Sequence, residues 1–348
     1  MFGTFRTVLA SFVVIGHLFG PYQLGSYAVF GFYVLSGFLM TKIMHETYGF
    51  TFTGKKRYLV NRFLRIYPTY WFAILLSLLL LFLYGSDITD FKSTMYIPKS
   101  PKEWIQNVFI LFSRGSSPRL SPATWALTVE IFFYIAICFG VSKTKLRSLS
   151  WLVLSFIYTI YLIFAHPQDW EARYFSIRAA SLPFSIGGLV YHSKEALIIY
   201  LKKWRLLKPT ILFLCVWINF CIFFIAESKF KVPLIYTVGF YINLSLMTLC
   251  IVSLIESKPP LMVKKFDKKI GNISYPVYLL HWQVGAFLYS VIFKTFGRRF
   301  MALEGLLFLL SSLILVFGCS LFAYFMIDKK IQKIRIHIKS NKSLKMNC

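Results

Sequence analysis

Two residues in the first apolar stretch of the chain are the strongest candidates for chemistry. Arg6 and His17 lie eleven positions apart in FRTVLASFVVIGHLFG. In a helix, eleven residues make about three turns and about 16 Å of rise, so both side chains lie on one face at different depths. A cation near one membrane surface and a titratable ring deeper inside would suit a long anionic molecule that extends inward. Ionisable groups at such depths usually mark a reactive site or a transport route.

Few other ionisable residues fall inside apolar stretches. Glu130 lies well inside one, His281 lies near the middle of another, and Arg178 lies a short way into a third. At about 1.5 Å per residue, His17 is about 20 Å from the inner surface and Glu130 about 10 Å from the outer surface, depths that coincide in a core about 30 Å thick. Because buried charges need partners, Glu130 is expected to pair with His17 or Arg178. Taken singly, each residue is explained as well by a hydrogen bond that fixes helix packing.

Two shorter patterns add polar groups to the candidate site. Arg62 and Arg65 are three positions apart in NRFLRIYPTYW, so they share a helical face. Guanidinium groups match the geometry of phosphate oxygens, which favours an anion site, although ordinary positive flanking of a span explains them too. In ISYPVYLLHW, the residues Ser274, Tyr278 and His281 form a polar stripe on one face, and such a stripe lines a cavity more often than it faces lipid.

The composition is that of a membrane protein. Hydrophobic residues make up 57% of the 348 residues and charged residues only 15%, whereas soluble domains carry about 25% charged residues. The net charge of +26 lies in short loops, which indicates anchoring at the cytoplasmic face rather than a nucleic-acid partner. The six cysteines form no C-x-x-C pair, so we expect neither a disulfide scaffold nor a metal site.

The hydropathy pattern predicts an all-α, polytopic membrane protein with about ten transmembrane helices. Both termini are expected in the cytoplasm, because the segments on that side carry more than twice as many Lys and Arg residues as the outer loops. Residues 1–327 are expected to form one domain, and the basic, amphipathic tail 328–348 is expected to lie on anionic headgroups. The loop 85–122 is expected to contain a short interfacial helix. The predicted spans are 5–22, 27–44, 67–84, 123–141, 150–165, 173–191, 209–226, 233–254, 272–293 and 303–327.

Five sequence blocks occur in a fixed order from about residue 2 to residue 327. They are an Arg-x10-His pair, F-x-V-L-S-G-F, R-x-x-R-I-x-P-x-Y-W, W-x-L-x-x-E-x-x-F-Y and S-Y-x-x-Y-L-L-H. Together they resemble the acyltransferase-3 family of integral membrane enzymes, which move acyl groups, usually acetyl from acetyl-CoA, onto cell-envelope glycans. Arg178 with Gly187 and Gly188 resembles a further family element more weakly. Pro276 departs from the small or aliphatic residue expected there, which puts the local backbone of the ninth span in doubt.

The resemblance implies a stand-alone enzyme with acyl-CoA as donor substrate and no permanently bound cofactor. The nucleotide phosphates would meet Arg62, Arg65 and Arg6 at the cytoplasmic mouth, and the pantetheine arm would run along the first span. The thioester would then lie near His17, which would act as general base. Glu130 would orient the imidazole and stabilise its charged form.

The acceptor would be a glycan or lipid-linked glycan that enters from the outer side. We expect a water-accessible tunnel through the bundle, lined by His17 and Glu130. The setting would be a bacterial inner membrane, with membrane lipids as further partners; nothing in the sequence indicates an oligomeric state or the identity of the glycan. The residues expected to contact the acceptor or the oxyanion are Arg178, Tyr278, His281 and Ser274.

Three alternatives remain open at this point. An acyl-enzyme route through Ser36 or Ser274 is less favoured, because the chain has no G-x-S-x-G motif and neither serine has an obvious base beside it in sequence. A transporter or flippase for an anionic lipid or lipid-linked sugar fits the intramembrane charges, although the two halves show no internal repeat. A structural subunit of an envelope-synthesis complex would not need His17 or Glu130.

Overall fold

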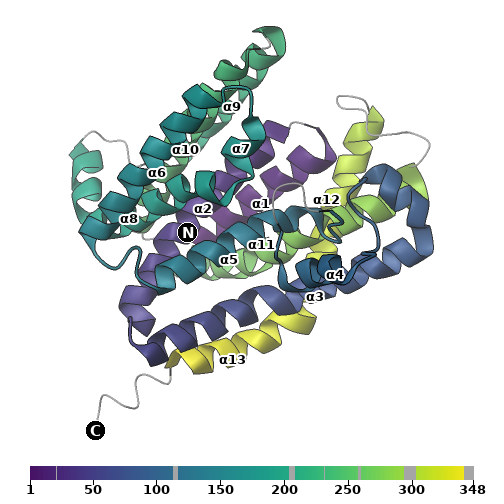
Figure 1. Ribbon diagram of the computed structural model, residues 1–348, viewed down its shortest axis with the longest axis horizontal. Helices are drawn as coiled ribbons and strands as arrows, with labels where there is room; N and C mark the ends of the chain where they lie inside the picture. The colour runs from purple at the N-terminus through teal and green to yellow at the C-terminus, as the bar shows by residue number, and fades with distance from the viewer. Residues whose placement is uncertain are drawn as a thin grey trace.

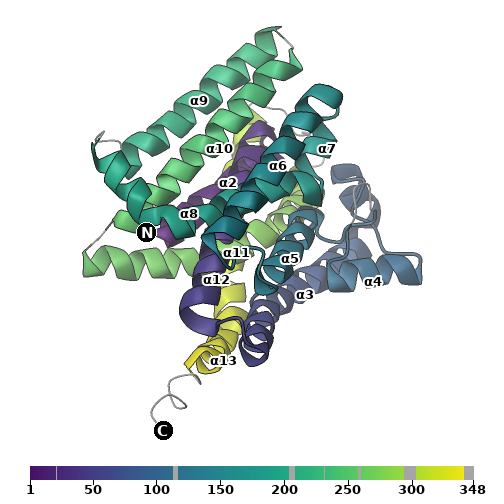
Figure 2. The same cartoon turned by 60° about the vertical axis from the view of Figure 1, so that its left-hand side comes forward.

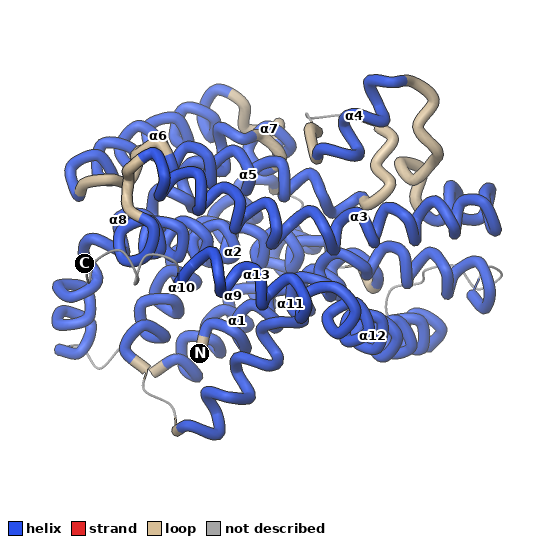
Figure 3. Tube along the Cα trace, turned by 90° about the horizontal axis from the view of Figure 1, so that it is seen from below, coloured by secondary structure: helices blue, strands red, loops and turns tan. Residues whose placement is uncertain are grey.

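The computed structural model describes residues 1–20, 22–112, 117–203, 208–230, 232–257, 260–293 and 303–340. Every regular element in this described part is a helix (Figure 3), as a bilayer requires of a chain whose backbone must bond internally. The elements are α1 (Phe2–Leu18), α2 (Tyr22–Ile43), η1 (Met44–Tyr48), α3 (Phe52–Phe91), α4 (Pro101–Phe109), η2 (Pro122–Thr124), α5 (Trp125–Cys138), α6 (Lys145–Ala165), α7 (Trp170–Tyr174), α8 (Ile177–Lys203), α9 (Pro209–Phe230), α10 (Pro233–Glu256), α11 (Leu261–Leu288), η3 (Tyr289–Phe293), α12 (Leu303–Ala323), η4 (Tyr324–Asp328) and α13 (Lys329–Ser340).

Each predicted span overlaps one of these helices, but the helices differ in length and hydropathy. Within the described residues, seven helices are long and apolar enough to cross a membrane: α2 with η1, α3, α6, α9, α10, α11 with η3, and α12 continued through α13. The helices α1 and α5 are apolar but shorter. The helix α8 is long, at 27 residues, and it packs against α2 and α6 mainly through small and apolar residues.

The helices α1, α2 and α11 form the centre of the bundle. α1 packs against both α2 and α11, α2 also contacts α8 and α10, and α11 also contacts α3 and α12. Figure 1 shows α1 and α11 enclosed between these outer helices, and Figure 2 shows α2, α6, α9 and α10 running in a similar direction. The polar stripes of α1 and α11 therefore face each other rather than lipid.

Glycines let α2 and α8 approach closely. A Cβ atom on Gly187 would overlap the carbonyl oxygen of Val34, and one on Gly37 would overlap the carbonyl oxygen of Phe184. Small residues allow the backbones of neighbouring membrane helices to meet in this way. The contact also stacks the rings of Tyr33 and Phe184, whose centroids are 5.0 Å apart. The glycines that the sequence associates with the sixth span thus set helix packing.

The start of α1 is held by a carboxylate from α11. Asp267 accepts hydrogen bonds from the backbone N–H of Gly3 at 3.1 Å and of Thr4 at 2.8 Å, and from the Thr4 hydroxyl at 2.8 Å. These N–H groups have no partner within their own helix, and a negative charge also complements the helix dipole. Gly271 packs directly on Gly3. The register of α1 on α11 is therefore fixed at this end.

The loop and tail predictions have different outcomes. The short helix expected within 85–122 is confirmed as α4. The tail helix α13 does not simply lie on a membrane surface, because it packs along the first half of α3 (Figure 1). Arg57 of α3 donates to the backbone oxygen of Ile338.

Pro276 is buried inside an uninterrupted α11, so the helix continues through the position where the sequence left its backbone in doubt.

The α2–α8 contact gives a stability prediction. Gly187→Leu should prevent the close approach of these helices and reduce the yield of folded protein, because the new side chain would overlap backbone that cannot move away cheaply. Gly318→Leu is the matched control, since no atom lies within 4 Å of a Cβ built there. The measurement is the monodisperse fraction and thermal midpoint of each variant in detergent. Equal stability of the two variants would show that the glycine contact is unimportant.

Candidate functional site

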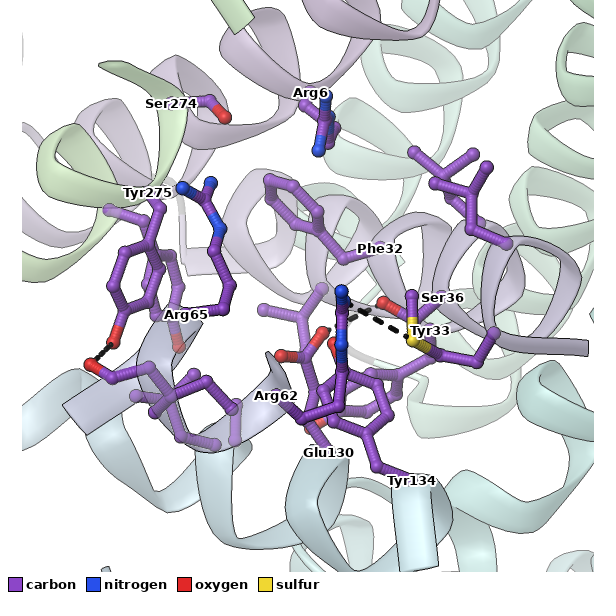
Figure 4. Close-up of a pocket in the computed structure, with 18 residues that line it drawn as sticks. Arg6, Phe32, Tyr33, Ser36, Arg62, Arg65, Glu130, Tyr134, Ser274 and Tyr275 are labelled. Carbon is purple, nitrogen blue, oxygen red and sulfur yellow. Dashed lines mark hydrogen bonds between the residues drawn. The ribbon is translucent and has the colours of Figure 1, made fainter. Parts of the chain in front are cut away.

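Three arginines and one glutamate meet in a cavity at the centre of the bundle (Figure 4). The cavity has a volume of about 120 Å³, which is room for several water molecules at about 10–15 Å³ each. It lies where α1, α2, α3, α5 and α11 come together. Its polar lining consists of Arg6, Tyr33, Ser36, Arg62, Arg65, Glu130, Tyr134, Ser274, Tyr275 and Tyr278.

The arginines reach this cavity from two helices. Arg62 and Arg65 lie on one face of α3, and Arg6 comes from α1 (Figure 4). Arg62 donates to the side-chain oxygen of Asn61 at 2.8 Å, and the guanidinium of Arg65 lies over the ring of Tyr275, 5.3 Å from its centroid. These neighbours orient the guanidinium groups without neutralising them. The convergence of the three arginines, expected from sequence, is confirmed.

The cavity carries more positive than negative charge. Within the described chain, none of Arg6, Arg62 and Arg65 forms a salt bridge with a carboxylate. A buried cation that lacks an opposite charge costs several kcal/mol, roughly, so such a group is kept where an anion will bind. Guanidinium forks favour phosphate and carboxylate oxygens above other anions. The arrangement is therefore suited to a ligand with several phosphate oxygens.

Glu130 has a different partner from the one expected. Its Oε1 atom accepts a hydrogen bond of 2.8 Å from the hydroxyl of Ser36 (Figure 4). Its neighbour on the next turn, Tyr134, lines the same cavity. The predicted pairing of Glu130 with His17 or Arg178 is wrong, because coinciding depth does not decide which helices are neighbours. The carboxylate instead provides a hydrogen-bond acceptor for a buried serine.

His17 pairs with the other intramembrane histidine. The Nδ1 atom of His17 and the Nε2 atom of His281 are 2.8 Å apart, and the two rings are stacked with centroids 5.1 Å apart. The Nδ1 atom of His281 lies 2.7 Å from the backbone oxygen of Tyr278. The ring of Trp282 packs on His17 at 5.1 Å. The pair thus joins α1 to α11 at the opposite end from the Asp267 cap.

The hydrogen-bond chain determines where the protons of the uncharged pair lie. A carbonyl oxygen only accepts, so Nδ1 of His281 must donate to Tyr278. The Nε2 atom of an uncharged His281 then carries a lone pair and accepts from Nδ1–H of His17. This makes Nε2 of His17 the nitrogen that can take up a proton. The charge formed by that protonation would be stabilised through Nδ1–H by the His281 ring, in the way a base is supported by its orienting partner.

The histidine pair lies next to the cavity but not in its lining. Tyr278 connects the two, since its ring lines the cavity and its backbone oxygen holds His281. The ring of Phe32 packs edge-on against Tyr278, with centroids 6.2 Å apart. Of the two residues expected to line a tunnel, Glu130 lines this cavity and His17 lies beyond Tyr278.

The residues expected to contact an acceptor are distributed over different places. Ser274 and Tyr278 line the arginine cavity, where their hydroxyls donate to the backbone oxygens of Gly271 and Ala123. Arg178 is exposed and lines a separate cavity beside Trp151, so the structure does not bring it to this site.

Among the described residues, no group of three or more His, Cys, Asp or Glu side chains could hold a metal ion.

Several lining residues were not identified as site residues from sequence. Tyr33 carries no motif that separates it from ordinary aromatic packing, and Tyr275 belongs to the S-Y-x-x-Y-L-L-H block but was not proposed as a site residue. Ser36 was considered from sequence only as the nucleophile of a less favoured acyl-enzyme route. One signal was available, because Ser36 and Glu130 are the central polar residues of two apolar stretches, but only the packing of α2 against α5 joins them.

Comparison with known proteins identifies the class of this site. The family model described as "Acyltransferase domain" matches residues 3–325. The chain therefore belongs to this acyltransferase family and is a membrane acyltransferase. It is also similar to an "O-acetyl transferase" of Shigella phage Sf6, with 23% identity over 294 residues that cover 79% of this chain and 82% of the relative. No solved structure matches the chain.

The His17–His281 bond gives an activity prediction. His281→Ala removes the acceptor for Nδ1–H of His17 and should lower acyl transfer at least about tenfold, because the base loses its orientation and the stabilisation of its charge. His281→Gln retains a side-chain oxygen that can accept this bond and should keep more activity than the alanine variant. The measurement is the initial rate of acyl transfer at matched protein levels. Equal rates for the two variants would exclude an orienting role for His281.

Proposed function

We propose that this enzyme is an O-acyltransferase that moves acetyl from acetyl-CoA to a hydroxyl of a cell-surface glycan, such as lipopolysaccharide O-antigen or exopolysaccharide, in a bacterial inner membrane. The observation that carries the proposal is the hydrogen-bonded pair of His17 and His281, which gives a half-buried general base beside an arginine-lined cavity. The family match and the name of the phage relative agree with acyl transfer to oxygen.

The donor would bind from the end of the bundle that the charge pattern assigns to the cytoplasm. Its phosphates would bind Arg62, Arg65 and Arg6, which form no salt bridge with a carboxylate of the described chain. The extended pantetheine arm would pass along α1 toward His17, a rise of about 16 Å from Arg6. This path leads past Tyr278 and Phe32, so their side chains would have to make room for the thioester.

The chemical step would proceed by general-base catalysis. Nε2 of His17 accepts the proton of the acceptor hydroxyl while its oxygen attacks the thioester carbonyl. His281 stabilises the resulting imidazolium through Nδ1–H of His17. The tetrahedral intermediate then collapses, the carbon–sulfur bond breaks, and the CoA thiolate takes back the proton from His17. The products are the acetyl ester and CoA, so no further reactant is needed.

The acceptor would approach from the opposite face, where α1 ends at Leu18. His17 lies one residue before this end, so a glycan hydroxyl on the outer side needs to enter the bundle only a short way. Of the expected acceptor contacts, Ser274 and Tyr278 remain candidates beside the donor cavity, and His281 acts through His17. Arg178 is too far from this cavity to be retained.

A second route is supported by the bond between Ser36 and Glu130. The carboxylate could take the Ser36 proton while the hydroxyl oxygen attacks the thioester, releasing CoA and leaving acetyl on Ser36. A second transfer to the acceptor would then use His17 as base. Sequence alone could not favour this route, because the base is 94 residues away along the chain.

The competing interpretation as a transporter or flippase has lost its main support. It relied on intramembrane charges without a catalytic arrangement, and the histidine pair supplies one. An acyltransferase family model that matches nearly the whole chain also favours an enzyme over a structural subunit.

Replacing His17 tests the general base. His17→Ala should reduce kcat by about 10² to 10⁴, the range typical of a lost general base, with little change in the KM for acetyl-CoA. The measurement is acetyl-CoA consumption by purified protein in detergent with a glycan acceptor, alongside mass spectrometry of envelope glycans from cells that express each variant. A folded His17→Ala variant with normal kcat would remove His17 from the mechanism.

The serine route has its own test. Incubating the enzyme with radiolabelled acetyl-CoA and no acceptor, then denaturing it, should leave no label on protein if transfer is direct. Label on the peptide that contains Ser36, lost in Ser36→Ala, would establish the acyl-enzyme. In the direct mechanism, Ser36→Ala should retain turnover, because only a hydrogen bond to Glu130 is removed.

A further inference from the structure

A fourth arginine lies beside the arginines of the cavity. Arg335 belongs to α13, the helix that packs along α3, and its Nε atom donates to the side-chain oxygen of Asn61 at 3.2 Å. The same oxygen accepts from Arg62 at 2.8 Å. Arg335 is close enough to Arg62 and Arg65 for electrostatic repulsion between the guanidinium groups. One neutral amide oxygen thus holds two cations together.

The position of Arg335 is fixed by several contacts between α13 and α3. The side-chain N–H of Asn61 donates to the backbone oxygen of Arg335 at 3.1 Å, so Asn61 binds both the side chain and the main chain of this residue. One turn earlier on α3, Arg57 donates to the backbone oxygen of Ile338. The contacts explain why a helix with so many basic residues can lie on a basic segment of α3.

Two carboxylates near this cluster, those of Glu130 and Asp328, attract its arginines but are fewer than the four guanidinium groups. Glu130 accepts from Ser36, and Asp328 accepts from the buried hydroxyl of Thr69 at 2.7 Å. Among the described residues, neither carboxylate forms a salt bridge with Arg335. Bringing like charges together is unfavourable unless an anion joins them. The cluster is therefore prepared for an anion with more than one charged oxygen.

We propose that α13 completes the donor site, with Arg335 binding a phosphate group at the nucleotide end of the acyl-CoA. This inference rests on the proposed use of an acyl-CoA donor. The helix that follows the last span would then be a wall of the substrate site. Bidentate guanidinium–phosphate bonds to α3 and α13 together would relieve the repulsion between these guanidinium groups. An anionic lipid headgroup offers the same phosphate chemistry, so the experiment must distinguish the two sources.

The test compares Arg335→Gln with Lys333→Gln. Lys333 lies on the same helix and is exposed, so its variant removes one positive charge from α13 at a position outside the cluster. In neutral detergent without anionic lipid, Arg335→Gln should raise the KM for acetyl-CoA about tenfold or more and leave kcat nearly unchanged, because the lost contact is remote from the thioester. Lys333→Gln should leave both constants near those of the unmodified enzyme.

A second set of measurements separates the explanations. Arg335→Lys keeps the charge but loses the guanidinium fork, so it should give an intermediate KM, and it also serves if the glutamine variant fails to fold. An unchanged KM for folded Arg335→Gln or Arg335→Lys in detergent would overturn the proposal. So would an effect that appears only in nanodiscs containing phosphatidylglycerol, which would assign Arg335 to lipid. Failure of the unmodified enzyme to consume acetyl-CoA would instead contradict the proposed function.

Discussion

The packing of α1 against α11 is the contact on which the site depends. At one end, the Asp267 carboxylate and the Gly3–Gly271 approach fix how the two helices meet. At the other end, His17 and His281 share a hydrogen bond. Between these ends, Arg6 from α1 and Ser274 from α11 face a common cavity. A shift of either helix would separate the histidines and displace the arginine together.

The bundle separates two kinds of polar chemistry by a layer of aromatic residues. On one side, arginines accumulate charge that the protein itself does not neutralise. On the other, the histidines form a hydrogen-bonded pair anchored to the backbone oxygen of Tyr278. Tyr278 belongs to both regions, through its ring and its backbone. This separation suits a substrate whose anionic and reactive ends are far apart, because each end meets the environment that its chemistry requires.

Sequence reasoning succeeded where spacing along a single helix determines which side chains share a face. Helical spacing placed Arg62 and Arg65 on one face, and both line the cavity. The prediction of side-chain partners failed, because depth in the membrane alone does not show which helices are in contact. Glu130 was therefore given to His17 and Arg178, although the α2–α5 contact gives it to Ser36. Arg335 was not predicted as a site residue for a related reason. A basic amphipathic helix has the same sequence pattern whether it packs on lipid or on protein.

The cap on α1 has a consequence for the way the protein is made. The carboxylate that satisfies the first helix lies 264 residues further along the chain, on a helix that begins only at Leu261. During synthesis, the first N–H groups of α1 therefore lack this carboxylate as a partner until most of the polypeptide has been translated. A ribosome that stops early releases a fragment that lacks both the cap and the second histidine, so incomplete chains cannot form the His17–His281 pair.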